Sequence, residues 1–64
     1  MITSVHQKIV MLNKALDHLI KTRSLLNDVD LGEQFEHLEA NADDGIYSAQ
    51  GYIDTIIWRL KDQL

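Results

Sequence analysis

Apolar residues recur every three or four positions along two stretches of the chain, a spacing that places side chains on one face of an α-helix. In the first stretch, the apolar positions are Ile2, Val5, Ile9, Leu12, Leu16, Leu19 and Leu26. In the second, they form one stripe about 100° wide, made of Leu31, Phe35, Leu38, Ala42, Ile46, Ala49, Ile53, Ile56, Ile57 and Leu60. The pattern predicts amphipathic helices over about residues 4–27 and 31–63.

Signals for helix starts precede both stretches. Thr3 or Ser4 can cap the first helix, and Ser4 with Gln7 has the spacing of a capping box, in which each side chain accepts a backbone N–H. Asp30 precedes Glu33 by the same three residues, which predicts a second N-terminal cap.

One run of turn-forming residues, Asn27-Asp28-Val29-Asp30, separates the two stretches, and no proline interrupts either helix. We therefore predict an all-α fold: a single domain over residues 1–64, built as an antiparallel two-helix hairpin. Its turn lies at about 28–30 and its second helix is the longer.

The predicted helices differ in length. At 1.5 Å per residue, the first would be about 36 Å long and the second about 50 Å. The last turns of the second helix would then extend beyond the first as an apolar overhang of Ile56, Ile57, Trp58, Leu60 and Leu64.

A second, smaller set of residues lies on a different face of the second helix. Ala40, Tyr47, Gly51 and Trp58 recur at spacings of seven, four and seven. Gly45 and Gly51 each cost about 1 kcal/mol relative to alanine inside a helix, which favours a packing reason for them. The overhang and this face together predict a partner-binding site of Tyr47, Gly51, Ile53, Ile56, Ile57, Trp58, Leu60 and Leu64.

A chain of 64 residues is at the margin of independent stability and usually needs a further staple. There is no cysteine, and the three histidines stand far apart, so a disulfide or a structural zinc site is not available. Oligomerisation remains. We predict that the hairpin is completed by a protein partner or by self-association.

Charge is distributed unevenly around a net value of −4. Residues 1–27 carry four bases and one acid, whereas residues 28–44 carry seven acids and no base. This predicts two helices that attract each other, and it disfavours binding to nucleic acid or to a membrane surface.

Arg23 interrupts the first apolar stripe. Its long stem can lie along the second helix, and we expect its guanidinium to reach Glu33 or Glu36. With Lys21 it would also lie in the last turn of the helix, where cations complement the helix dipole.

The sequence shows no catalytic constellation. Cysteine is absent, and the serines have no histidine at a useful spacing, so we expect no enzyme activity and no cofactor. His37 lies close to Glu33 and Glu39 and could share a metal with them, but a solvent-facing group is the preferred interpretation.

A polar face of the first helix could follow RNA phosphates, but two lysines without an aromatic residue favour a solvated face. Its members are Gln7, Lys14, His18 and Lys21. No apolar run reaches the roughly 20 residues of a membrane span, and the N-terminus does not resemble a signal peptide. We therefore expect a cytoplasmic protein.

The second half of the chain resembles the small E-type co-chaperones of the type III secretion needle protein. The similarity rests on Gln34-Phe35 and on the isoleucine-rich, aromatic-ended segment 46–59, and it covers roughly 25 residues. The resemblance implies a short helical hairpin that docks on a helical-repeat chaperone in the cytoplasm. The two together would keep the needle subunit from polymerising early.

The turn, residues 26–34, is similar instead to the hairpin turn of the Rop family of plasmid RNA-binding proteins. That resemblance implies a homodimeric four-helix bundle. The helix face that this family uses for RNA includes a central aromatic residue, whereas here the face reads Val10, Lys14 and His18. We keep RNA binding by such a dimer as the alternative function.

Overall fold

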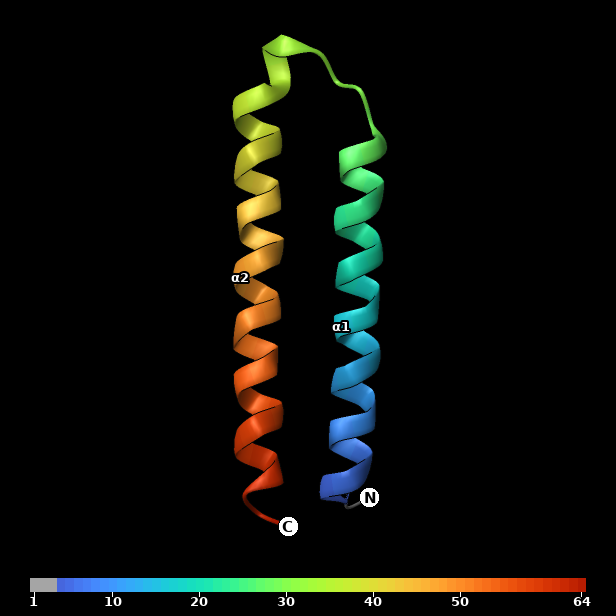
Figure 1. Cartoon of the computed structure of the whole chain (residues 1–64), viewed down its shortest axis with the longest axis vertical. Coiled ribbons are helices and arrows are strands. Elements are labelled where there is room, and N and C mark those ends of the chain that lie inside the picture. The colour runs from blue at the N-terminus through green and yellow to red at the C-terminus, as the bar shows by residue number, and fades with distance from the viewer. Residues whose placement is uncertain (1–3) are drawn as a thin grey trace.

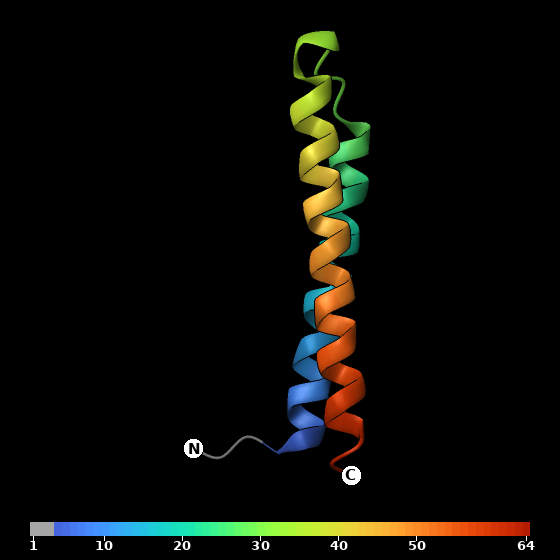
Figure 2. The same cartoon turned by 90° about the vertical axis from the view of Figure 1, so that its left-hand side faces the viewer.

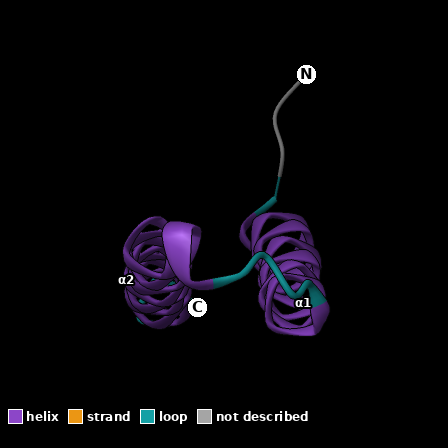
Figure 3. Cartoon of the chain, turned by 90° about the horizontal axis from the view of Figure 1, so that it is seen from above, coloured by secondary structure: helices purple, strands orange, loops and turns teal. Residues whose placement is uncertain are grey.

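The computed structural model describes residues 4–64 and shows two helices that lie side by side in opposite directions (Figure 1). Helix α1 spans Val5–Asp28, a short 3-10 turn η1 spans Glu33–Phe35, and helix α2 follows directly over Glu36–Lys61. Seen from above, the helices form a single layer (Figure 3). The predicted all-α hairpin with a longer second helix is confirmed.

The first helix begins with the capping box that the sequence predicts. The Ser4 hydroxyl accepts a hydrogen bond from the Gln7 backbone N–H at 3.1 Å, and the Ser4 N–H donates to Oε1 of Gln7 at 3.0 Å. Two backbone N–H groups that the helix itself leaves unpaired are thereby satisfied. Ile2 and Thr3, which the sequence places in the apolar stripe and at the cap, lie outside the described residues.

The second helix begins later than predicted, and Asp30 does not cap it. Gly32 has a φ of 85° and ends the loop, after which η1 forms its tight turn without a side-chain cap. Residues with a side chain rarely adopt this backbone conformation, and it cannot continue a helix. The first regular turn of α2 therefore starts at Glu36 instead of residue 31.

The helices meet along a seam whose residues recur in steps of four and three, the heptad spacing of coiled coils. On α1 the seam consists of Val5, Ile9, Leu12, Leu16, Leu19, Arg23 and Leu26, and on α2 of Glu39, Asp43, Ile46, Gln50, Ile53, Ile57 and Leu60. The helices cross at a shallow angle, as this packing requires (Figure 2). Ile57, 4% exposed, is the only buried side chain among residues 4–64.

The predicted overhang does not exist. The ion pair between Arg23 and Asp43 shows which residues of the two helices lie at the same level. Val5 lies 18 residues before Arg23 and Lys61 lies 18 residues after Asp43, so both helices end at the same level (Figure 1). The prediction was wrong because it counted residues 31–35 as helix, whereas the loop and η1 use them to reverse the chain. Ile57, placed in the overhang, is instead the most buried residue.

Within residues 4–64, neither helix combines the length and the apolar character that crossing a membrane requires.

Candidate interaction surfaces

A single layer of two helices leaves two broad faces open, one on each side of the seam. In an antiparallel pair, the residues that directly precede a seam position lie on one side of the hairpin. The residues that directly follow a seam position lie on the opposite side. Side chains can therefore be assigned to a face from the seam and the helical period.

One side is an almost uncharged surface, here called the apolar face. Its apolar members are Met11, Ala15 and Leu25 on α1 and Leu38, Ala42, Gly45, Ala49, Tyr52 and Ile56 on α2, and the uncharged His18 and Thr22 lie on the same side of α1. Leu25, Leu38 and Tyr52 are 66%, 64% and 74% exposed, so these large side chains have no cover within the described chain. The charged side chains that follow this spacing are Lys8 and Arg59, both near the chain ends.

The apolar stripe predicted for α2 is wider than the observed seam, and part of it lies on the apolar face. Ile46 and Ile53 point to α1 as expected, but Leu38 and Ala42 are exposed, and Glu39 and Asp43 occupy the seam beside them. One neighbouring helix covers only a narrow strip, and the stripe of α2 is wider than that strip. Its remainder therefore faces solvent.

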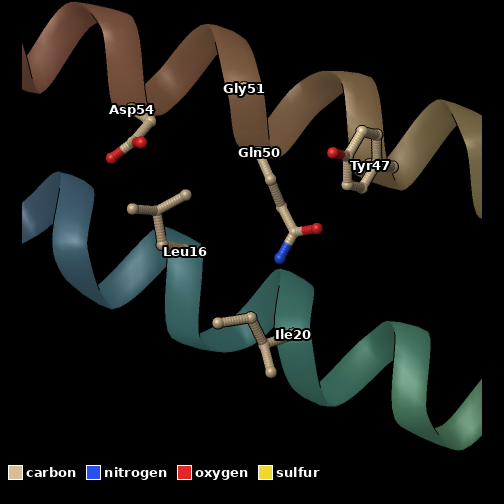
Figure 4. A pocket seen from close by; sticks show the side chains of 6 residues that line it. All are labelled: Leu16, Ile20, Tyr47, Gln50, Gly51 and Asp54. Carbon is tan, nitrogen blue, oxygen red and sulfur yellow. The ribbon is translucent and has the colours of Figure 1, made fainter.

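The opposite side carries a shallow hollow at mid-height, here called the Tyr47 hollow. Its lining is Leu16 and Ile20 from α1 and Tyr47, Gln50, Gly51 and Asp54 from α2. Figure 4 shows Leu16 and Gln50 reaching into the space between the helices and Ile20 lying against α1, with Tyr47 and Asp54 toward the two ends of the hollow. A second hollow, the acidic hollow, lies nearer the turn and is lined by Asn27, Glu36, Glu39, Ala40 and Asp43.

Arg23 lies between these two hollows. Its Nε donates to Oδ1 of Asp43 at 2.7 Å and its Nη2 donates to Oδ2 at 3.0 Å, a two-point ion pair. The guanidinium carbon also lies 5.0 Å from the centre of the Tyr47 ring, within the range of a cation–π contact. The hydrogen bond raises the pKa of Arg23 and lowers the pKa of Asp43 below its ordinary value of 3.8.

The sequence-based partners of Arg23 were wrong. Glu33 begins η1 and Glu36 begins α2, so both lie nearer the turn than Arg23 does. Asp43 is the acid that faces Arg23 across the seam. Arg23 and Lys21 are also outside the last turn of α1, because that helix continues to Asp28.

The Arg23–Asp43 pair makes stability depend on acid. The pKa of Asp43 is lower in the folded chain than its ordinary value of 3.8. The ion pair therefore contributes fully to the free energy of unfolding above pH 3.8, and this contribution is lost as the pH falls through the lowered pKa of Asp43. We expect Asp43→Asn to unfold at a lower urea concentration than the wild type at neutral pH, with a difference that narrows in acid. Urea titrations of both proteins at several pH values measure this. A difference that persists unchanged in strong acid would contradict the assignment.

The predicted partner-binding residues do not form one surface. Ile53, Ile57 and Leu60 point into the seam, so the intact hairpin does not offer Ile57 to a partner. Ile56 belongs to the apolar face, and Leu64 follows the helix end. Tyr47, Gly51 and Trp58 follow one another on the side of the Tyr47 hollow, as their spacing predicts.

Sequence reasoning missed Leu25, Tyr52 and Ile20 as surface candidates. The signal was available: once a heptad seam is assigned to each helix, these residues fall outside it. The polar residues considered for RNA contact, Gln7, Lys14, His18 and Lys21, are all exposed on α1.

No group of three or more histidine, aspartate or glutamate side chains within residues 4–64 is arranged to hold a metal ion. Comparisons of the chain with protein-family models, with curated proteins and with solved structures find no significant match.

Proposed function

We propose that this chain is a non-catalytic interaction module, a helical hairpin whose apolar face binds another protein. The observation that carries the proposal is the imbalance between core and surface. One side chain is buried among residues 4–64, while Leu25, Leu38 and Tyr52 are each more than 60% exposed on one side.

The energetic argument follows from this imbalance. Burying a large apolar side chain contributes about 1.5–3 kcal/mol, and the apolar face exposes five of them: Met11, Leu25, Leu38, Tyr52 and Ile56. Covering them would contribute several kcal/mol, comparable with the whole stability of a small domain, about 5–15 kcal/mol. Such a surface on a small chain is typical of a protein-binding site.

The more specific form of the proposal is a cytoplasmic co-chaperone for the type III secretion needle subunit. It is supported by the resemblance of Gln34-Phe35 and of residues 46–59 to that family, and by the hairpin architecture. The apolar face would lie against a helical-repeat chaperone, whose stacked repeats form a concave surface that accepts helices. Small residues at Ala42, Gly45 and Ala49 allow a partner helix to approach closely.

Co-expression with a helical-repeat chaperone and a needle subunit from the same organism tests this form. We expect a stable complex in size-exclusion chromatography with light scattering, and Ile56→Glu should abolish it because the charge enters an apolar contact. Trp58→Glu is the matched control: the side chain is two positions away, exposed, and on the other side of the hairpin. It should leave the complex intact.

Three outcomes separate the alternatives. A wild-type chain that self-associates, and loses this property in Ile56→Glu, would support the interaction module with a second copy as the partner. Equal loss with both variants would place the contact elsewhere and contradict the use of the apolar face. A compact monomer that is unaffected by either partner protein would overturn the proposal.

A further inference from the structure

We propose that the side of the hairpin opposite the apolar face binds an amphipathic helix that carries a basic residue. The site consists of two neighbouring hollows on this side, the Tyr47 hollow and the acidic hollow, here called together the Tyr47 groove. It uses other residues than the apolar face, so it does not depend on the proposed function.

The Tyr47 hollow can receive an apolar side chain. Leu16 forms part of its lining, and Ile20 and Tyr47 are 55% and 64% exposed at its borders. Gly51 has no side chain to cover the backbone of α2. The space beside it is open, because a Cβ atom at this position would meet nothing within 4 Å. A partner helix can therefore approach α2 closely at this point and place one side chain between the two helices.

The acidic hollow determines the charge of the partner. Three carboxylates, from Glu36, Glu39 and Asp43, line it. The single ion pair found among residues 4–64 joins Arg23 to Asp43. Of the three carboxylates, Glu36 and Glu39 therefore have no cationic partner within those residues. Glu39 is half-buried at the seam, where a carboxylate gains more from a nearby cation than it would in open solvent. A lysine or arginine fits this hollow, and an acidic ligand does not.

The distance between the hollows determines the spacing in the partner. Gly51 and Ala40 are eleven residues apart on α2, which corresponds to about 16 Å of helix. A helix lying along the groove would therefore present its apolar anchor and its basic residue about eleven positions, or three turns, apart. Arg23 lies between the hollows, held by Asp43 and the Tyr47 ring. Its positive charge disfavours a second basic residue in the part of the partner helix that lies between the anchor and the basic residue.

A labelled synthetic helix tests the proposal by fluorescence anisotropy. The probe carries one leucine anchor and an arginine eleven positions away, and a matched probe has glutamate in place of that arginine. We expect the arginine probe to bind at least tenfold more tightly than the glutamate probe. The difference should shrink as salt is added, because the contact with Glu39 is ionic. Glu39→Gln should remove most of the same difference.

Glycine variants separate binding from folding. Gly51→Leu adds a bulky side chain at the α2 edge of the Tyr47 hollow, and it should weaken binding of the arginine probe at least tenfold while α2 becomes more stable. Gly45→Leu is the matched control: the same change in the same helix, with equally open space, but on the apolar face. It should leave the affinity unchanged.

Equal affinity for the two probes, or equal affinities of the two glycine variants, would overturn the proposal. Sedimentation of the chain without a probe examines a competing occupant. A dimer that Gly51→Leu dissociates and Gly45→Leu does not would show that a second copy fills the groove, and would also overturn it.

Discussion

Replacing Ile57 with aspartate is expected to unfold the hairpin. Ile57 is 4% exposed at the seam, and the substitution would place a carboxylate among apolar side chains without a partner. Even isoleucine to alanine in a core costs about 2–5 kcal/mol. At roughly 0.05–0.15 kcal/mol per residue, a chain of this size has only about 3–10 kcal/mol to lose. Far-UV circular dichroism and a urea titration should show loss of helix and of the cooperative transition.

The neighbouring residue provides the control. Ile56 is 48% exposed on the apolar face, so Ile56→Asp leaves the charge in contact with water and should retain the helical spectrum of the wild type. The pair differs by one position in the sequence and by the side of the helix. If Ile57→Asp unfolded at the same urea concentration as Ile56→Asp, the alignment of the two helices described here would be incorrect.

The second large effect is stabilising: Gly45→Ala combined with Gly51→Ala should raise the free energy of unfolding by about 2 kcal/mol. Each glycine lies inside α2 with open space where a Cβ would stand, so alanine gains about 1 kcal/mol per site without a steric cost. The positions are about 9 Å apart along the helix, so the effects should add. Thermal melts followed by circular dichroism should show an increase in Tm of roughly 8–16 °C.

Gly32→Ala is the matched control, because the same substitution should have the opposite sign there. Gly32 has a φ of 85°, and alanine is strained in this conformation even though its Cβ atom would meet nothing within 4 Å. The melting temperature should fall by several degrees. A melting temperature that rose with Gly32→Ala as it does with the helical glycines would contradict the observed turn geometry.

Most local features of this protein follow from the sequence by itself, and the start of α2 is the exception. The spacing of apolar residues predicts both helices, the Ser4–Gln7 pair predicts the start of α1, and the turn formers at residues 27–30 predict the reversal. These features depend on residues within one or two helical turns of each other. Their outcome is therefore set by propensity, capping and amphipathicity, which are properties of a short segment.

The alignment of the helices, and therefore the identity of the surfaces, was decided only by the tertiary structure. Gly32 delays α2 until residue 36, and Arg23 then meets Asp43 in place of the acids predicted for it. This alignment makes the helices end together, removes the overhang and buries Ile57. A shift of a few residues at the turn moves every contact across the seam, and the apolar period tolerates several such registers. A single neighbouring helix covers only part of the wide apolar stripe of α2, so which part remains exposed depends on the packing of both helices at once.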